Sequence, residues 1–211
     1  MINILINEPD TFYREGLVHI LRELFLSEYG EEIAILSEFS PACIWKADVI
    51  ILSLCQGEAY TCKQEFKFRN RGVVIGLTNS CARQTQILPS CYRDMVHISR
   101  RSARECLYDT VVQTWNERRH YPHYPPDYTC YKCKQRSLSE REYFIAEELL
   151  AGKTVTGIAR DLNISEKAVY AHKYALMRKY NLSGTWELFI FLSHLNRRGF
   201  FPVRSQKTHF L

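Results

Sequence analysis

The stretch between positions 167 and 178 combines basic and aromatic residues in an order that suits contact with DNA. Residues three and four positions apart lie on one side of a helix, so a helix here would collect these residues on one face. Such a face offers cations for phosphates and hydrogen-bonding groups for base edges, whereas an ordinary solvated helix would more often carry pairs of Glu and Lys. We predict DNA contacts from Lys167, Tyr170, Ala171, Lys173, Tyr174 and Arg178.

Helices are also expected on either side of this stretch. Ser139 and Glu142 have the spacing of a capping box, which begins a helix. Thr154 can cap a second helix, and Ser165 can cap a third that runs to about Tyr180. A fourth helix follows. This order predicts a helix-turn-helix module whose third helix enters the major groove of DNA.

Residues 138–195 resemble the helix-turn-helix domain of the LuxR/FixJ class. The matching positions are Leu138-Ser139-Glu140-Arg141-Glu142, Gly152, Ile158-Ala159, Ile164-Ser165, Val169 and His172. The resemblance implies a DNA-binding transcription regulator. The sequence departs from the family at Ala168, where Thr is usual, and at Tyr180, where Leu is usual. These departures leave the preferred base sequence open.

Residues 173–180 and 187–192 are also similar to the capsule and fimbrial regulators of enteric bacteria related to the Rcs system. That resemblance implies pairing with a second, phosphorylatable member of the family. The expected partners are therefore double-stranded promoter DNA and either a second copy of this chain or a related response regulator. A dimer would let two recognition helices address half-sites about one DNA turn apart.

The first part of the chain alternates apolar runs of strand length with polar stretches. Each polar stretch is long enough to lead the chain back to the start of a next parallel strand. The runs cover residues 2–6, 33–36, 49–54, 73–77 and 95–98. A helix after the first run should bury Phe12, Leu17, Ile20, Leu21 and Leu24. Apolar strands between helices indicate a parallel sheet covered on both faces. Residues 1–115 thus resemble the receiver domain of two-component response regulators, an α/β flavodoxin-like fold.

The receiver resemblance implies a phosphorylation site built from carboxylates that hold magnesium, an acceptor Asp and a Lys. In this sequence Ser53 stands at the acceptor position, and Arg100 stands where Lys is expected. Serine cannot form the acyl phosphate of this chemistry, so we predict a degenerate receiver with no phosphorylation site. Glu8 and Asp10 form only an approximate acidic pair, which we interpret as solvated loop acids.

Charge and proline content divide the chain into parts. Residues 134–211 hold 13 Lys and Arg against 7 Asp and Glu, and residues 1–133 hold 15 against 16. A basic part attached to a neutral one is typical of a nucleic-acid-binding module beside another domain. We therefore predict an α/β receiver-like domain at 1–118, a proline-containing linker at 119–136, an all-α four-helix LuxR-type domain at 137–196 and a tail at 197–211.

The eight cysteines do not indicate a secreted disulfide framework, because their spacing is irregular. Most are expected to be buried small hydrophobic residues. His120, His123, Cys130 and Cys133 could together bind a tetrahedral zinc ion. The aromatic residues around them fit a simple docking contact of this stretch equally well, so we predict no metal and no cofactor. A thiol-redox or zinc-dependent sensor or enzyme using Cys130 and Cys133 is the alternative to a non-enzymatic regulator.

The fourth helix is apolar over more of its circumference than one neighbouring helix can bury. Its apolar residues are Trp186, Phe189, Ile190, Phe191, Leu192 and Leu195. We expect part of this surface, with Phe191 exposed, to carry dimer contacts. Alternatively, Phe189 and Leu192 complete the core of the small domain. No run is long enough to span a membrane, and residue 1 leads directly into an apolar run, which predicts a cytoplasmic protein.

Overall fold

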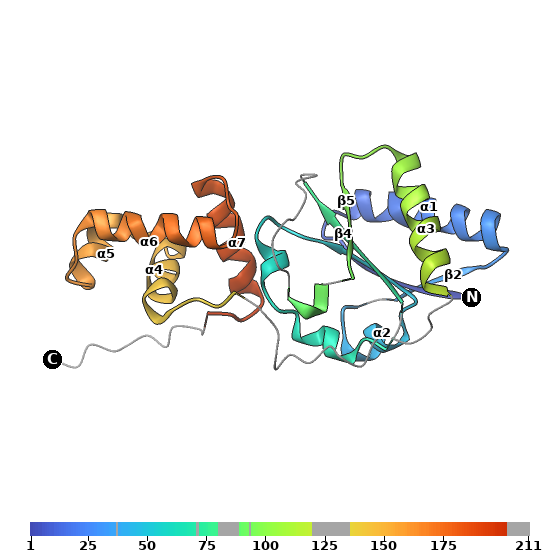
Figure 1. Ribbon diagram of the computed structural model, residues 1–211, viewed down its shortest axis with the longest axis horizontal. Coiled ribbons are helices and arrows are strands. Elements are labelled where there is room, and N and C mark those ends of the chain that lie inside the picture. Colours follow the sequence, from blue (N-terminus) through green and yellow to red (C-terminus); the bar gives the residue numbers. More distant parts are fainter. Residues whose placement is uncertain (37, 71, 80–88, 93, 120–135, 202–211) are drawn as a thin grey trace. The chain divides into compact units, whose positions relative to one another are not determined.

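The computed structural model describes residues 1–211 except 37, 71, 80–88, 93, 120–135 and 202–211. By its contacts the chain forms two compact units. The first unit contains Met1–Leu54 and Ala59–Gln135, and the second contains Arg136–Leu211 together with the short segment Cys55–Glu58. Most of the linker that the sequence predicts lies outside the described residues. Figure 1 shows strands and helices in the first unit and, among the described residues after 136, helices without strands.

A five-stranded parallel sheet forms the centre of the first unit, in the order β2-β1-β3-β4-β5. The strands are β1 (Ile2–Asn7), β2 (Ile33–Leu36), β3 (Val49–Ser53), β4 (Val73–Thr78) and β5 (Val96–Ser99). In the middle of the sheet Ile51 pairs with Ile6 on one side and with Ile75 on the other. Because both faces of these strands are covered, their residues are apolar without alternation.

Helices pack on both faces of the sheet. Helices α1 (Thr11–Tyr29) and α3 (Arg104–Arg119) share one buried cluster with β1, β3 and β4. The short helix α2 (Pro41–Lys46) and the 3-10 turns Gln64–Phe68 and Ser90–Tyr92 cover the opposite face. One detail of the sequence prediction is wrong, because Phe12 in the first turn of α1 is 92% exposed.

Four helices make up most of the described part of the second unit after residue 136, as the sequence predicts. They are α4 (Glu140–Leu150), α5 (Val155–Asp161), α6 (Glu166–Lys179) and α7 (Thr185–Arg197). A capping box at Ser139 and Glu142 begins α4, and the hydroxyl of Thr154 accepts the Gly157 N–H to begin α5. Ile145, Ile158 and Val169 meet in the core and are fully buried. The predicted fold class, an α/β domain with a parallel sheet followed by an all-α four-helix domain, is confirmed in its architecture.

The described cysteines are not fully buried, which corrects the sequence prediction. Cys43, Cys55, Cys62 and Cys91 are half-buried, and Cys106 is exposed. Cys43 and Cys91 still pack against the apolar cluster beneath α2, so they contribute part of their surface to it. As to membranes, the described helices include none with the length and apolar character that a transmembrane span requires.

Candidate nucleic-acid interface

Helix α6 is positioned by the turn that precedes it. Asn163 adopts a positive φ of 50°, which Asn tolerates better than most residues, and this lets the chain reverse direction between α5 and α6. The hydroxyl of Ser165 then accepts the backbone N–H of Ala168 at 3.2 Å and begins α6. Thr156 on α5 donates a hydrogen bond to Glu166 at 2.7 Å, which ties the two helices together.

One face of α6 is exposed along its length. Its members are Lys167, Tyr170, Ala171, Tyr174 and Arg178, all exposed. The rings of Tyr170 and Tyr174 stack with centroids 6.4 Å apart, so the two aromatic side chains lie together on this face. On the opposite side Val169, Leu176 and Tyr180 are buried, while His172 is half-buried. The separation of faces expected from the sequence is present.

Lys173 differs from the other predicted contact residues. It is half-buried, and its Nζ donates a hydrogen bond to the hydroxyl of Thr185 at 2.9 Å. Lys173 therefore lies at the border of the exposed face and links α6 to the start of α7. The bond is made to a neutral partner, so the positive charge of Lys173 is not neutralised by it.

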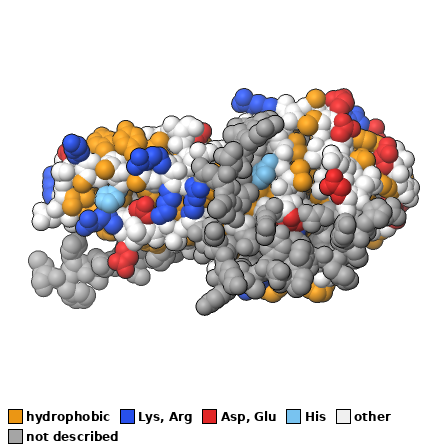
Figure 2. All heavy atoms as spheres, viewed as in Figure 1, with side chains coloured by type: hydrophobic (Ala, Val, Ile, Leu, Met, Phe, Trp, Pro, Cys, Tyr) orange, Lys and Arg blue, Asp and Glu red, His pale blue; other side chains and the backbone are white. Residues whose placement is uncertain are grey.

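The cations of this unit fall into two groups. Lys153 forms ion pairs with Glu148 and Asp161, and Lys179 pairs with Glu142 at 2.7 Å. Lys167 and Arg178, in contrast, form no ion pair with any residue that the structure describes. Figure 2 shows Lys and Arg side chains gathered on the drawn face of the helical unit. The cations on the exposed face of α6 are thus available to phosphate groups.

The first unit brings together the residues that stand at the receiver phosphorylation site. The Arg100 guanidinium lies 3.3 Å from a carboxylate oxygen of Glu8 and 3.7 Å from one of Asp10. It also donates a hydrogen bond to the hydroxyl of Ser53 at 3.3 Å and stacks 4.5 Å from the ring centre of Tyr13. A positive side chain therefore occupies the space between the acidic residues and the end of β3.

This arrangement corrects the interpretation of the acidic pair. The Glu8 side chain is fully buried and ion-paired, so Glu8 is not a solvated loop acid, whereas the Asp10 side chain is about half exposed. The carboxylate of Asp10 also caps α1 by accepting the backbone N–H of Tyr13 at 3.1 Å. The sequence placed Arg100 at the lysine position but did not reveal that its guanidinium reaches Glu8, Asp10 and Ser53 together.

Comparison with known protein families identifies the second unit. Residues 136–192 match the family described as bacterial regulatory proteins, luxR family. The helical unit is a LuxR-type helix-turn-helix domain. Within this LuxR-type domain, α5 and α6 are the helix-turn-helix pair, and α6 holds the position of the recognition helix. A comparison with curated proteins found no match.

Two solved structures are similar in fold over most of this chain. One is a complex of the two-component response regulator RcsB with DNA, 18% identical, covering 91% of this chain and 98% of that chain with a TM-score of 0.51. The other is RcsB from Salmonella enterica serovar Typhimurium bound to promoter P1flhDC in the presence of the phosphomimetic BeF3⁻. It is 16% identical and covers 92% of this chain and 98% of that chain, with a TM-score of 0.54. At such identities the likeness concerns the fold.

Helix α7 of the LuxR-type domain keeps an exposed apolar patch, which we define as Trp186, Phe189 and Ile190, 71%, 45% and 37% exposed. The expectation that part of α7 stays uncovered is therefore confirmed. The choice of Phe191 as an exposed position is wrong, because Phe191 is fully buried and its ring lies 4.6 Å from that of Tyr180. Leu192 and Leu195 are buried as well.

The residues of the zinc or thiol site that the sequence suggested, His120, His123, Cys130 and Cys133, all lie outside the described residues.

Proposed function

We propose that this protein is a sequence-specific DNA-binding transcription regulator that inserts α6 into the major groove. The observation that carries the proposal is the exposed face of α6, on which Lys167 and Arg178 flank the stacked pair Tyr170 and Tyr174. Tyrosine hydroxyls can bond to base edges or phosphates, and unpaired cations near both ends of the face can reach the phosphate backbone. Ala171, between the tyrosines, permits close approach of the helix.

Charge reversal on this face tests the proposal. We expect Lys167→Glu and Arg178→Glu to weaken binding to a promoter fragment selected from genomic DNA, each by about 1–3 kcal/mol or more, because phosphate repels the new carboxylate. Band-shift titrations of the full chain at several salt concentrations would measure this effect, and each variant should also bind with a shallower salt dependence than the parent.

The exposed Lys46 of α2, in the other unit, supplies a matched control. Lys46→Glu makes the same change in net charge without touching the LuxR-type domain, so its binding should equal that of the parent. If Lys167→Glu and Arg178→Glu fold and bind DNA as the parent does, the assignment of α6 as the recognition helix is wrong.

We further propose that the receiver-like unit works without phosphorylation. Ser53 offers a hydroxyl where an acyl phosphate requires a carboxylate. In addition, Arg100 is already ion-paired with Glu8 and Asp10, the groups that would otherwise attract magnesium, and offsets one of their two negative charges. Regulation would then depend on the amount of protein or on a binding partner.

The apolar patch of α7 supports a proposal about assembly. Trp186 and Phe189 stack with centroids 6.2 Å apart, which presents a continuous apolar surface beside polar residues. Exposed surfaces of this kind commonly mark protein contacts. We propose that the protein binds DNA as a dimer, with itself or with a related response regulator, through this patch.

A further inference from the structure

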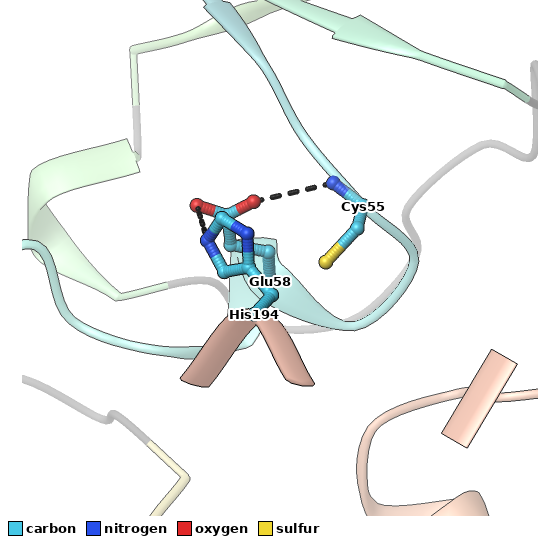
Figure 3. A group of neighbouring side chains, drawn as sticks. All are labelled: Cys55, Glu58 and His194. Carbon is cyan, nitrogen blue, oxygen red and sulfur yellow. Dashed lines mark hydrogen bonds and ion pairs between the residues drawn. The ribbon is translucent and has the colours of Figure 1, made fainter. Parts of the chain in front are cut away.

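A cysteine, a glutamate and a histidine meet in the second unit, away from the exposed face of α6. Figure 3 shows the thiol of Cys55, the carboxylate of Glu58 and the imidazole of His194 side by side. Their potential ligand atoms, one from each residue, all lie within 4.8 Å of one another. His194 comes from α7, and the other two residues come from the segment Cys55–Glu58.

The segment is held firmly in the unit by its own contacts. The side chain of Gln56 donates a hydrogen bond to the carbonyl oxygen of Asn181 at 2.8 Å. Gly57 has a φ of +87°, and a Cβ there would lie 3.0 Å from the side chain of Leu182 and 3.1 Å from the ring of Phe191. Glycine suits both this positive φ and the close contact with Leu182 and Phe191. The backbone at Gly57 is therefore well defined, and so are the positions of the side chains on either side of it.

The three side chains are also oriented toward one another. One oxygen of Glu58 accepts the backbone N–H of Cys55 at 3.2 Å, and the other lies 3.0 Å from Nε2 of His194. The Glu58 side chain is fully buried, whereas the His194 side chain is 31% exposed and leaves a route from solvent. Nε2 of His194 is buried, and the Glu58 carboxylate lies directly against it.

We propose that Cys55, Glu58 and His194 bind a divalent cation of the zinc class. Thiolate, carboxylate and imidazole are the ligands that zinc takes in proteins, at bond lengths of about 2.0–2.3 Å. A tetrahedral ion with such bonds holds its ligand atoms roughly 3.3–3.8 Å apart, so only a small movement of the side chains closes the site.

The charges of the site fit a dication. A thiolate, a carboxylate and a neutral imidazole together balance two positive charges, so the loaded site is neutral where Glu58 is buried. Without an ion, Glu58 faces His194 and Arg198, whose Nη1 lies 4.0 Å from the same carboxylate oxygen. Arg198 is partly exposed, so its guanidinium can turn toward solvent when the ion binds. Binding releases the proton of the Cys55 thiol to solvent, so affinity should fall as the pH is lowered.

Three protein ligands leave the fourth position of a tetrahedral ion to water or to another ligand. The site would join α7 to the segment Cys55–Glu58 and so stiffen the helix that carries the apolar patch. This site differs from the one that the sequence suggested at Cys130 and Cys133, and it uses none of the same residues.

Cobalt and zinc titrations of the reduced, tag-free full chain test the proposal. We expect the chain to bind Co²⁺ with a thiolate-to-cobalt charge-transfer band, and Zn²⁺ to displace the cobalt and raise the thermal unfolding temperature. Cys55→Ser should remove the charge-transfer band, and His194→Gln should weaken Zn²⁺ binding by at least about tenfold in competition with a chromophoric chelator. Circular dichroism in the presence of EDTA checks that each variant folds.

Two controls separate this site from other thiols. Cys106→Ser, which removes an exposed thiol on α3, should bind metal as the parent does. The double variant Cys130→Ser/Cys133→Ser should also keep the charge-transfer band. The proposal is overturned if the parent binds neither ion, if folded Cys55→Ser and His194→Gln bind Zn²⁺ like the parent, or if the band disappears only in the Cys130→Ser/Cys133→Ser variant. DNA binding is a separate measurement, so failure here leaves the role of α6 unaffected.

Discussion

Arg100 connects the residues that stand at the receiver phosphorylation site. Its guanidinium contacts two carboxylates and the hydroxyl of Ser53, and it stacks on the ring of Tyr13. The Tyr13 hydroxyl is itself affected, because burial raises its pKa above the ordinary value, although the charge of Arg100 opposes that rise. The Arg100 guanidinium thus lies among the residues at which a working receiver would hold a metal ion and a phosphoryl group.

Removing this cation should destabilise the receiver-like unit. Arg100→Met leaves the fully buried carboxylate of Glu8 without its ion pair, and loss of one partner of a buried pair costs about 3–5 kcal/mol. Urea unfolding of the variant should show that loss, and the double variant Arg100→Met/Glu8→Gln should recover part of it. Equal stability of parent and Arg100→Met would contradict the role given to Arg100.

Ser53 leads to a chemical prediction at the same site. Incubation of the protein with acetyl phosphate and magnesium should yield no acid-labile adduct in an intact-mass measurement, because the serine hydroxyl cannot form an acyl phosphate. A phosphorylatable receiver carried through the same incubation serves as the positive control. A stoichiometric adduct on this chain would refute the proposal that it works without phosphorylation.

At the scale of a single element, the start of α4 shows how local sequence and packing combine. Ser139 and Glu142 form the capping box, and Glu142 also accepts a hydrogen bond from Lys179 at the end of α6. Burial by itself would raise the pKa of Glu142, but the bonds from Lys179 and from Ser139 outweigh it, so the pKa lies below its ordinary value. The carboxylate therefore stabilises the folded domain most when it is charged.

This pKa shift predicts a pH dependence with a definite sign. The contribution of Glu142 should be complete above the ordinary pKa of a glutamate in an unfolded chain, about 4.3, and should be lost as the pH falls through the lower pKa of the folded state. Glu142→Gln should lower the free energy of unfolding at neutral pH by about 1 kcal/mol, and the difference from the parent should shrink in acid. Urea unfolding at several pH values would measure it.

The exposed Glu140, in the first turn of the same helix, provides the control. Glu140→Gln removes the same charge near the helix N-terminus without touching Lys179 or Ser139. Its effect at neutral pH should be the smaller one. An equal loss in both variants would mean that the helix dipole, rather than the capping box and the bond from Lys179, accounts for the stabilisation by Glu142.

At the scale of the whole molecule, the chain joins a receiver-like unit of nearly balanced charge to a basic LuxR-type domain. The charge difference favours contact of the second unit with DNA, whose phosphates attract it over several ångströms. The apolar patch of α7 adds a surface suited to a protein partner. A dimer formed there would present two copies of α6 to half-sites spaced by about one DNA turn.

Assembly can be tested at Trp186, which is 71% exposed. Trp186→Glu should weaken dimer formation and operator binding without lowering the unfolding temperature, as measured by light scattering and band-shift stoichiometry. Trp45→Glu, at an exposed tryptophan of α2, is the matched control and should leave both unchanged. One protomer per operator, unaffected by Trp186→Glu or by an added related regulator, would refute the dimer proposal.

By contrast, Phe191→Ala should cost about 3–5 kcal/mol of stability, because Phe191 is fully buried.

The sequence alone determined the elements of both units and the outward face of α6. Hydrophobic periodicity and capping residues depend only on neighbours along the chain, so Ser139, Thr154 and Ser165 marked the starts of their helices correctly. The apolar runs likewise located all five strands to within one or two residues. The sequence also shows directly that Ser53 stands where a receiver would have its acceptor Asp.

Tertiary structure decided which side chains are covered and which distant groups meet. Helical periodicity could not tell Phe191 from Phe189, because both belong to the apolar part of α7 and only packing against Tyr180 buries the first. The contact of Arg100 with Glu8 joins residues 92 positions apart, and His194 lies still further along the chain from Glu58. Such meetings depend on how strands and helices are brought together in space, which a local pattern does not encode.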